Sequence, residues 1–230
     1  MNSSAAEKII VAIDVPTEAE ALHLMMQLSG EVGAFKIGLQ RYVADGPALV
    51  RAAWLLGPVF LDLKLHDIPN TVGKAVESAD KLGVKMLTLH LSGGGEMVRA
   101  AVKARKSEML LLGVTVLTSS NDATLQETGI SGTTADQVLR LARLGVENGI
   151  DGLVASPQEA RLLRQEFGHK IKKVTPGIRP HGSDVGDQKR IASPREAVEA
   201  GADYLVIGRP ITGAADPKAA VRRIAAELEA

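Results

Sequence analysis

The stretch Phe60-Leu61-Asp62-Leu63-Lys64-Leu65-His66-Asp67-Ile68-Pro69-Asn70-Thr71 has the pattern of a buried strand that runs into a helix, yet it carries acidic and basic side chains. Because successive strand side chains point to opposite faces, Asp62 and Lys64 share one face and the intervening leucines take the other. Asp67 follows just past the expected strand end. Charges in an apolar strand are costly to bury unless they neutralise one another, and such arrays are where proton chemistry is tuned. We therefore expect Asp62, Lys64 and Asp67 to form an acid–base site.

Short apolar segments alternate with amphipathic segments almost from end to end of the chain. The apolar segments predict strands over residues 9–15, 34–38, 59–65, 84–91, 109–117, 152–155, 172–175 and 204–207. The segments between them predict helices over residues 48–56, 71–82, 96–106, 134–148, 158–167 and 219–228. Another helix is expected to begin after Thr17, which forms a capping-box pattern with Glu20.

This alternation predicts a (β/α)8 TIM barrel, a fold that typically needs about 250 residues. We expect one such domain over residues 1–230. A doubly wound open sheet is the alternative. No strand is followed by the G-x-G-x-x-G spacing of that fold, and the three adjacent glycines at 93–95 do not fit it. The pattern therefore favours the barrel.

The composition excludes several classes of function. Basic and acidic residues balance at 27 each and aromatic residues make up only 3% of the chain, which argues against a nucleic-acid partner. There is no cysteine, so thiolate nucleophiles and cysteine metal sites are excluded, and His66, His90 and His181 lack metal-ligand spacing. No apolar run is long enough to span a membrane and no secretory pattern follows the first residues, so we expect a cytoplasmic protein.

Barrel enzymes keep their active sites at the carboxyl ends of the strands, so polar residues there are candidates. Asp14 ends the first predicted strand, Lys36 lies in the second, and Thr118 follows the fifth. Simpler explanations are open for some of these residues. Asp14 could brace a turn, Lys36 could extend outward from a strand end, and Asp67 could cap the following helix.

A second group of candidates suits a phosphate. Gly208 and Arg209 end the last predicted strand, where barrels often bind phosphate, and arginine is a bidentate donor to phosphate oxygens. Residues 176–190 are too rich in Gly, Pro and Asp for a regular element, which predicts a functional loop or lid. Arg179 and Gln188 lie in this loop and could reach the same anion.

Residues 62–71 resemble the signature segment of the orotidine 5′-phosphate decarboxylase family. Residues 9–14, 35–38, 117–119, 175–180 with 187–188, and 206–212 resemble further segments of that family in the same order, so the resemblance covers essentially the whole chain. It implies an enzyme of de novo pyrimidine biosynthesis that converts orotidine 5′-monophosphate to uridine 5′-monophosphate. It implies neither a cofactor nor a metal.

The resemblance also implies a role for each candidate. Lys64 would protonate C6 of the pyrimidine, and Asp62 would face the departing carboxylate. The charged network would consist of Lys36, Asp62, Lys64 and Asp67. The other substrate-binding residues would be Asp14, Ile68, Thr71, Thr118, Pro176, Arg179, Gln188, Gly208 and Arg209.

A homodimer follows from the same resemblance, with Asp67, Ile68 and Thr71 contributed to the partner's site.

Two other functions compete with the decarboxylase. Magnesium-dependent sugar-phosphate decarboxylases and aldolases of the same superfamily share an Asp-x-Lys-x-x-Asp strand, but they resemble one another in placing an acid where this chain has Lys36. A catalytically inactive barrel that only binds a nucleotide or a partner would be indicated by loss of Lys64 or Asp67, and both are present.

Overall fold

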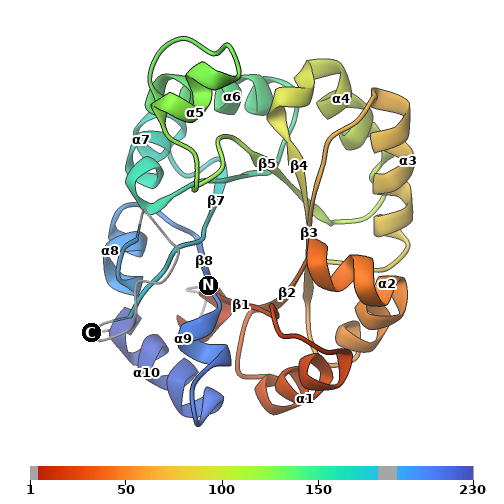
Figure 1. Ribbon diagram of the computed structural model, residues 1–230, viewed down its shortest axis with the longest axis vertical. Coiled ribbons are helices and arrows are strands. Elements are labelled where there is room, and N and C mark those ends of the chain that lie inside the picture. The colour runs from red at the N-terminus through yellow and green to blue at the C-terminus, as the bar shows by residue number, and fades with distance from the viewer. Residues whose placement is uncertain (1–4, 181–190, 230) are drawn as a thin grey trace.

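A computed structural model describes residues 5–180 and 191–229, and within them eight parallel strands close into a barrel in sequence order (Figure 1). Each strand pairs with the next, and β8 pairs with β1. The strands are β1 (Ile9–Ala12), β2 (Ala34–Gly38), β3 (Val59–Leu65), β4 (Met86–His90), β5 (Leu110–Val114), β6 (Gly152–Val154), β7 (Lys172–Thr175) and β8 (Tyr204–Ile207). The predicted (β/α)8 fold is confirmed.

Helices surround the barrel and cover the outer faces of its strands (Figure 1). In the described ranges the α-helices are α1 (Glu18–Leu28), α2 (Leu39–Trp54), α3 (Pro69–Asp80), α4 (Gly94–Ala104), α5 (Asp122–Glu127), α6 (Thr134–Glu147), α7 (Pro157–Phe167), α8 (Pro194–Glu199), α9 (Arg209–Thr212) and α10 (Pro217–Glu229). Two short 3-10 helices, η1 (Ala5–Lys8) and η2 (Leu91–Gly93), complete these segments. None of the helices so described is both long enough and apolar enough to cross a membrane.

Alternating strand side chains build two separate cores. One set points into the barrel and fills it, and its members are Ile10, Ala12, Ala34, Phe60, Met86, Leu112, Val174 and Val206. The other set faces outward and packs under the helices, as Leu61 and Leu87 do. Because the barrel interior is filled with side chains, a ligand has room only beyond the strand ends.

The ends of several elements differ from their predicted positions. Helix α2 consists of two helical segments separated by a kink at Gly46, whose backbone is not helical (φ 62°). The segment after Pro47 agrees with the helix predicted from residue 48, and the segment that begins at Leu39 was not predicted. β1 and β5 stop at Ala12 and Val114 rather than at residues 15 and 117. Beyond β5 the apolar run continues as cavity lining, so hydrophobicity alone overestimated the strand.

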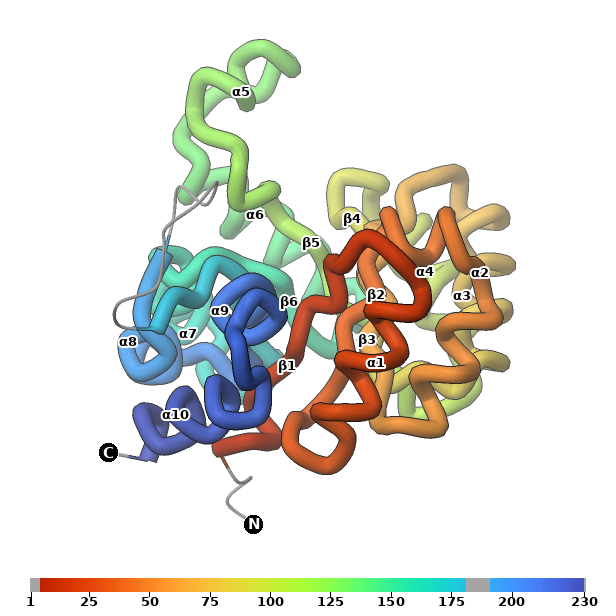
Figure 2. Tube along the Cα trace, turned by 60° about the horizontal axis from the view of Figure 1, so that its bottom comes forward, coloured from red at the N-terminus to blue at the C-terminus, as the bar shows by residue number. Residues whose placement is uncertain are grey.

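Helix α5 lies in a segment for which the sequence predicted no element. It is capped by Asn121, whose side-chain oxygen accepts a hydrogen bond from the Thr124 amide at 3.0 Å. Figure 2 shows α5 standing apart from the other helices, beyond the end of β5. With so few turns, its helical periodicity is too short to be detected in the sequence. By contrast, the capping box of Thr17 and Glu20 at the start of α1 is confirmed.

The amino ends of β7 and β8 are joined by a buried lysine. Lys173 is 1% exposed, and its ammonium donates hydrogen bonds to the carbonyls of Gly168 (3.0 Å) and Ile171 (2.8 Å). Asp203 lies 3.5 Å from this ammonium and also accepts a hydrogen bond from the Lys173 amide at 2.8 Å. Burial lowers the pKa of Lys173, and Asp203 acts in the opposite direction. The same carboxylate is 3.8 Å from the half-exposed ammonium of Lys172.

These two neighbouring lysines allow a matched stability test. We expect Asp203→Ala to lower the free energy of unfolding by about 3 kcal/mol, since it leaves the Lys173 ammonium buried without its counterion. Lys172→Ala should cost less than about 1 kcal/mol, because it removes only a solvated pair. Urea denaturation of both variants measures the difference. Equal losses would show that the buried pair contributes nothing beyond a surface contact.

Candidate active site

A cavity of about 470 Å³ opens at the carboxyl ends of the strands. Inward-facing apolar side chains line it, and they are Ala12, Phe60, Val114, Val154, Val174 and Val206. Its charged lining residues are Asp14, Lys36, Asp62, Lys64, Arg179 and Arg209. The cavity therefore offers an apolar surface for a flat ring, flanked by groups able to bind an anion.

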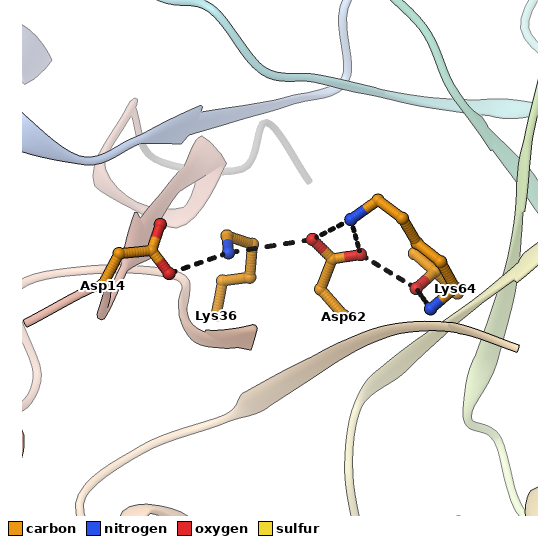
Figure 3. Close-up of polar contacts among 5 residues, drawn as sticks. Asp14, Lys36, Asp62 and Lys64 are labelled. Atoms are coloured by element: carbon orange, nitrogen blue, oxygen red, sulfur yellow. Dashed lines mark hydrogen bonds and ion pairs between the residues drawn. The ribbon is translucent and has the colours of Figure 1, made fainter. Parts of the chain in front are cut away.

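Four of these charges alternate in a row that runs from the segment after β1 across β2 to β3 (Figure 3). Their order is Asp14, Lys36, Asp62, Lys64. The Lys36 ammonium is 3.4 Å from Asp14 and 3.7 Å from Asp62. The Lys64 ammonium donates to both oxygens of Asp62 at 2.8 Å. Because each lysine has a carboxylate beside it, the row carries no net charge although its two central members, Lys36 and Asp62, are largely buried.

Lys64 reaches Asp62 through an irregular strand rather than the regular one that the sequence predicted. Between β3 and β4 the register shifts after Leu61, and pairing resumes only at Leu65. Within this interval Lys64 has φ 50°, the one positive value among the described non-glycine residues. Such a left-handed backbone costs on the order of 1–3 kcal/mol and persists only where the surroundings impose it. The alternation rule brought the right side chains together, but it did not reveal this strain.

Thr88 of β4 faces this irregular interval, and the sequence analysis missed it. Its hydroxyl donates to Asp62 at 2.9 Å and accepts from the Lys64 amide at 2.8 Å. Burial raises the pKa of the Asp62 carboxyl, but Lys36, Lys64 and the Thr88 hydroxyl outweigh burial and leave the pKa below its usual value. Asp62 is therefore ionised at neutral pH. A threonine inside an apolar strand was the only signal that the sequence offered.

Gly38 is a second residue that sequence reasoning missed. It is the β2 residue paired with Asp62, and it precedes α2. A Cβ atom at this position would lie 3.1 Å from the Lys36 ammonium and 3.2 Å from an Asp14 oxygen. A side chain there would have to displace the Lys36–Asp14 ion pair by a few tenths of an ångström, so Gly38 leaves room for the pair in its present position.

Two histidines lie beside the row. The rings of His66 and His90 are tilted, with centroids 5.6 Å apart. Burial lowers the pKa of His90, and His66 and Lys64 lower it further, while Asp62 acts in the opposite direction. His90 is therefore neutral at pH 7 and adds no charge beside Lys64.

Across residues 5–180 and 191–229, no three His, Asp or Glu side chains gather in a way that could hold a metal ion.

Most of the predicted site residues meet at this cavity. Those that line it are Asp14, Lys36, Asp62, Lys64, Thr118, Pro176, Arg179, Gly208 and Arg209. Thr212 of α9 lines it as well and was not predicted. Asp67, Ile68 and Thr71 are exposed and are not among its lining residues, so the chain does not bring them to its own site. Gln188 and His181 lie outside the described residues.

The sequence matches the model of the "Orotidine 5'-phosphate decarboxylase / HUMPS family" over residues 7–224. The chain belongs to this family. A relative from Idiomarina loihiensis, named orotidine 5′-phosphate decarboxylase, is 52% identical over 225 residues that cover 96% of this chain and 97% of that protein. A relative of the same name from Anaeromyxobacter sp. (strain K) is 50% identical, with 97% and 99% coverage.

Solved structures agree with this family assignment. The crystal structure of orotidine 5′-phosphate decarboxylase from Lactobacillus acidophilus superposes with a TM-score of 0.86 at 36% sequence identity. The match covers 96% of this chain and 99% of that one. The chain therefore shares its barrel fold with that decarboxylase over nearly its full length.

The electrostatic balance at Asp62 can be tested directly. We expect Lys64→Met to raise the pKa of Asp62, because the variant loses both a charge and a hydrogen-bond donor while burial persists. A ¹³C NMR titration of the Asp62 carboxyl carbon measures it, and Lys74→Met, on the exposed face of α3, is the control. Because the folded-state pKa is lowered, this group stabilises the fold above pH 3.8 and loses that effect as pH falls further. An unchanged pKa in Lys64→Met would contradict the assigned cause.

Proposed function

We propose that this protein decarboxylates orotidine 5′-monophosphate to uridine 5′-monophosphate, a step of de novo pyrimidine biosynthesis. One observation carries the proposal: the Lys64 ammonium, bonded to both oxygens of Asp62, lines a cavity that also contains Arg179 and Arg209. A proton donor and phosphate-binding groups thus share one cavity. The names of relatives at about half sequence identity support the same activity.

Different residues of the cavity lining would bind the phosphate, the ribose and the pyrimidine of the substrate. Arg179, Gly208 and Arg209 follow β7 and β8, where barrels bind phosphate, and they would hold the phosphate group. Asp14 and Lys36 would contact the ribose hydroxyls. Thr118 and Pro176 would lie along the pyrimidine, which would rest on the apolar floor of the cavity.

Lys64 would supply the chemistry at the pyrimidine. The bond between C6 and the carboxyl carbon breaks, carbon dioxide leaves, and the electron pair stays on C6, where no adjacent group delocalises it well. A fixed ammonium beside C6 stabilises this charge and then transfers a proton to the carbon. Lys64 is left as a neutral amine, and a proton from solvent restores it.

Asp62 would hold the Lys64 ammonium in line, and it would face the departing carboxylate. Its lowered pKa means that it is ionised, so both of its oxygens can accept from the Lys64 ammonium at 2.8 Å. The phosphate lies far from the reacting carbon. Its binding energy can nevertheless be used to hold the carboxylate and the ammonium in position for the reaction.

A homodimer that shares residues between sites is also part of the proposal. The Ile68 side chain is 66% exposed, and Asp67 and Thr71 beside it are exposed as well. Leu39 and Val43, which follow the adjacent strand β2, are 58% and 76% exposed. Large apolar side chains exposed after two paired strands support an interaction surface at this end of the barrel. In a dimer built on it, Asp67, Ile68 and Thr71 would enter the partner's cavity.

The proposed reaction is tested by ultraviolet absorbance. We expect purified protein to convert orotidine 5′-monophosphate to uridine 5′-monophosphate with EDTA present, because the proton donor is a side chain of the chain itself. Conversion that stops with EDTA and returns with Mg²⁺ would contradict a metal-independent reaction. No conversion by folded protein under either condition would refute the decarboxylase and favour a sugar-phosphate substrate.

Shared sites are tested by mixing inactive variants. Heterodimers of Lys64→Ala and Asp67→Ala subunits should regain activity, because one of their sites combines an intact Lys64 with the partner subunit's Asp67. A mixture of Lys64→Ala and Lys36→Ala is the control, since Lys36 and Lys64 meet at Asp62 within one chain. It should stay inactive. Equal recovery in both mixtures, or recovery in neither, would count against Asp67 crossing the interface.

A further inference from the structure

We infer that Thr88 is a positioning residue that holds Lys64 and Asp62 in their working arrangement. Thr88 lies in the middle of β4 and is fully buried. Its hydroxyl contacts both members of the pair, through the Asp62 carboxylate and the Lys64 amide. The inference rests on the proposed function, in which this pair acts at the reacting carbon.

The sheet register explains why a side chain takes this position. Leu61 and Leu65 of β3 pair with Leu87 and Leu89 of β4, so three β3 residues face the single residue Thr88. The extra length removes the normal β4 carbonyl partner of the Lys64 amide. A part-buried amide without a partner is costly, and the Thr88 hydroxyl oxygen supplies the missing acceptor. The same bond fixes the residue whose φ is 50°.

The donors and acceptors that are present determine the direction of both hydrogen bonds of the Thr88 hydroxyl. Ionised Asp62 can only accept, so the single hydroxyl proton of Thr88 points to its Oδ1 atom. The hydroxyl lone pairs are then left for the Lys64 amide. Asp62 Oδ1 also accepts from the Lys64 ammonium at 2.8 Å. One hydroxyl thereby sets the rotation of the carboxylate and the backbone that carries the ammonium.

Thr88 acts through these residues and not on the substrate. It is absent from the described lining of the cavity, whereas Asp62 and Lys64 are both in it. A structural role alone would affect stability. A positioning role predicts a loss in turnover that exceeds any loss in nucleotide binding, because the phosphate and ribose contacts lie elsewhere.

The test compares three variants of nearly equal size. Thr88→Val removes the hydroxyl and keeps the shape, and we expect its kcat to fall about 10- to 100-fold, the usual effect of losing a hydrogen bond to a charged group. Its dissociation constant for uridine 5′-monophosphate should stay close to the wild-type value. Thr88→Ser keeps the hydroxyl and should recover most of the turnover. Thr115→Val, at a buried threonine that follows β5, should keep the wild-type kcat.

Crystal structures of the same variants without nucleotide give a readout that is independent of activity. In Thr88→Val we expect Lys64 to leave φ near 50° or to lose its two 2.8 Å contacts with Asp62, and in Thr88→Ser we expect both to be retained. If Thr88→Val does not fold, Thr88→Cys keeps the volume with a weaker donor and should show a partial loss of kcat.

An inactive wild-type protein would refute the proposed function, and the crystal structures would still decide the positioning role. Wild-type kcat in Thr88→Val, or an unchanged Lys64–Asp62 geometry in that variant, would overturn the inference. So would a Thr88→Ser variant as impaired as Thr88→Val, because a retained hydroxyl would then have no effect.

Discussion

Asp62 lies between two ammonium groups at the end of a buried strand, and the rest of the site depends on that contact. An isolated carboxylate would be costly in this position and would take up a proton. With Lys64 at 2.8 Å and Lys36 at 3.7 Å, its pKa is lowered and it stays ionised. Asp14 then balances the second lysine. The alternation of charge gives each ammonium a carboxylate partner at the mouth of an apolar barrel, and the proposed chemistry requires the Lys64 ammonium as donor.

The barrel makes this arrangement possible by separating stability from function. The Lys173–Asp203 pair joins the amino ends of β7 and β8, and the apolar side chains that fill the barrel hold the sheet together. At the carboxyl ends, β3 departs from regular pairing and Lys64 adopts a left-handed backbone. Strain of this kind persists where a rigid scaffold imposes it. The irregularity places the lysine over Asp62 rather than along the face of the sheet.

Local patterns in the sequence were sufficient to predict the fold and the Asp62–Lys64 pair at the centre of the site. Strand periodicity predicted the barrel, and the two-residue spacing of Asp62 and Lys64 predicted their contact. The roles of Thr88 and Gly38 could not be predicted, because they depend on which β4 residue faces a bulge and on how closely β2 approaches β3. Those are properties of register between strands. Helix α5 and the first half of α2 were not predicted because both are short. The first half of α2 also ends at the Gly46-Pro47 pair.

In the proposed reaction the Lys64 ammonium delivers the proton while other groups bind the nucleotide. The most direct measurement is kcat for orotidine 5′-monophosphate beside the dissociation constant for uridine 5′-monophosphate in Lys64→Ala. We expect near-normal binding of the product and a loss of turnover by several orders of magnitude, with Lys74→Ala unchanged in both. Near-normal turnover in Lys64→Ala would contradict the account.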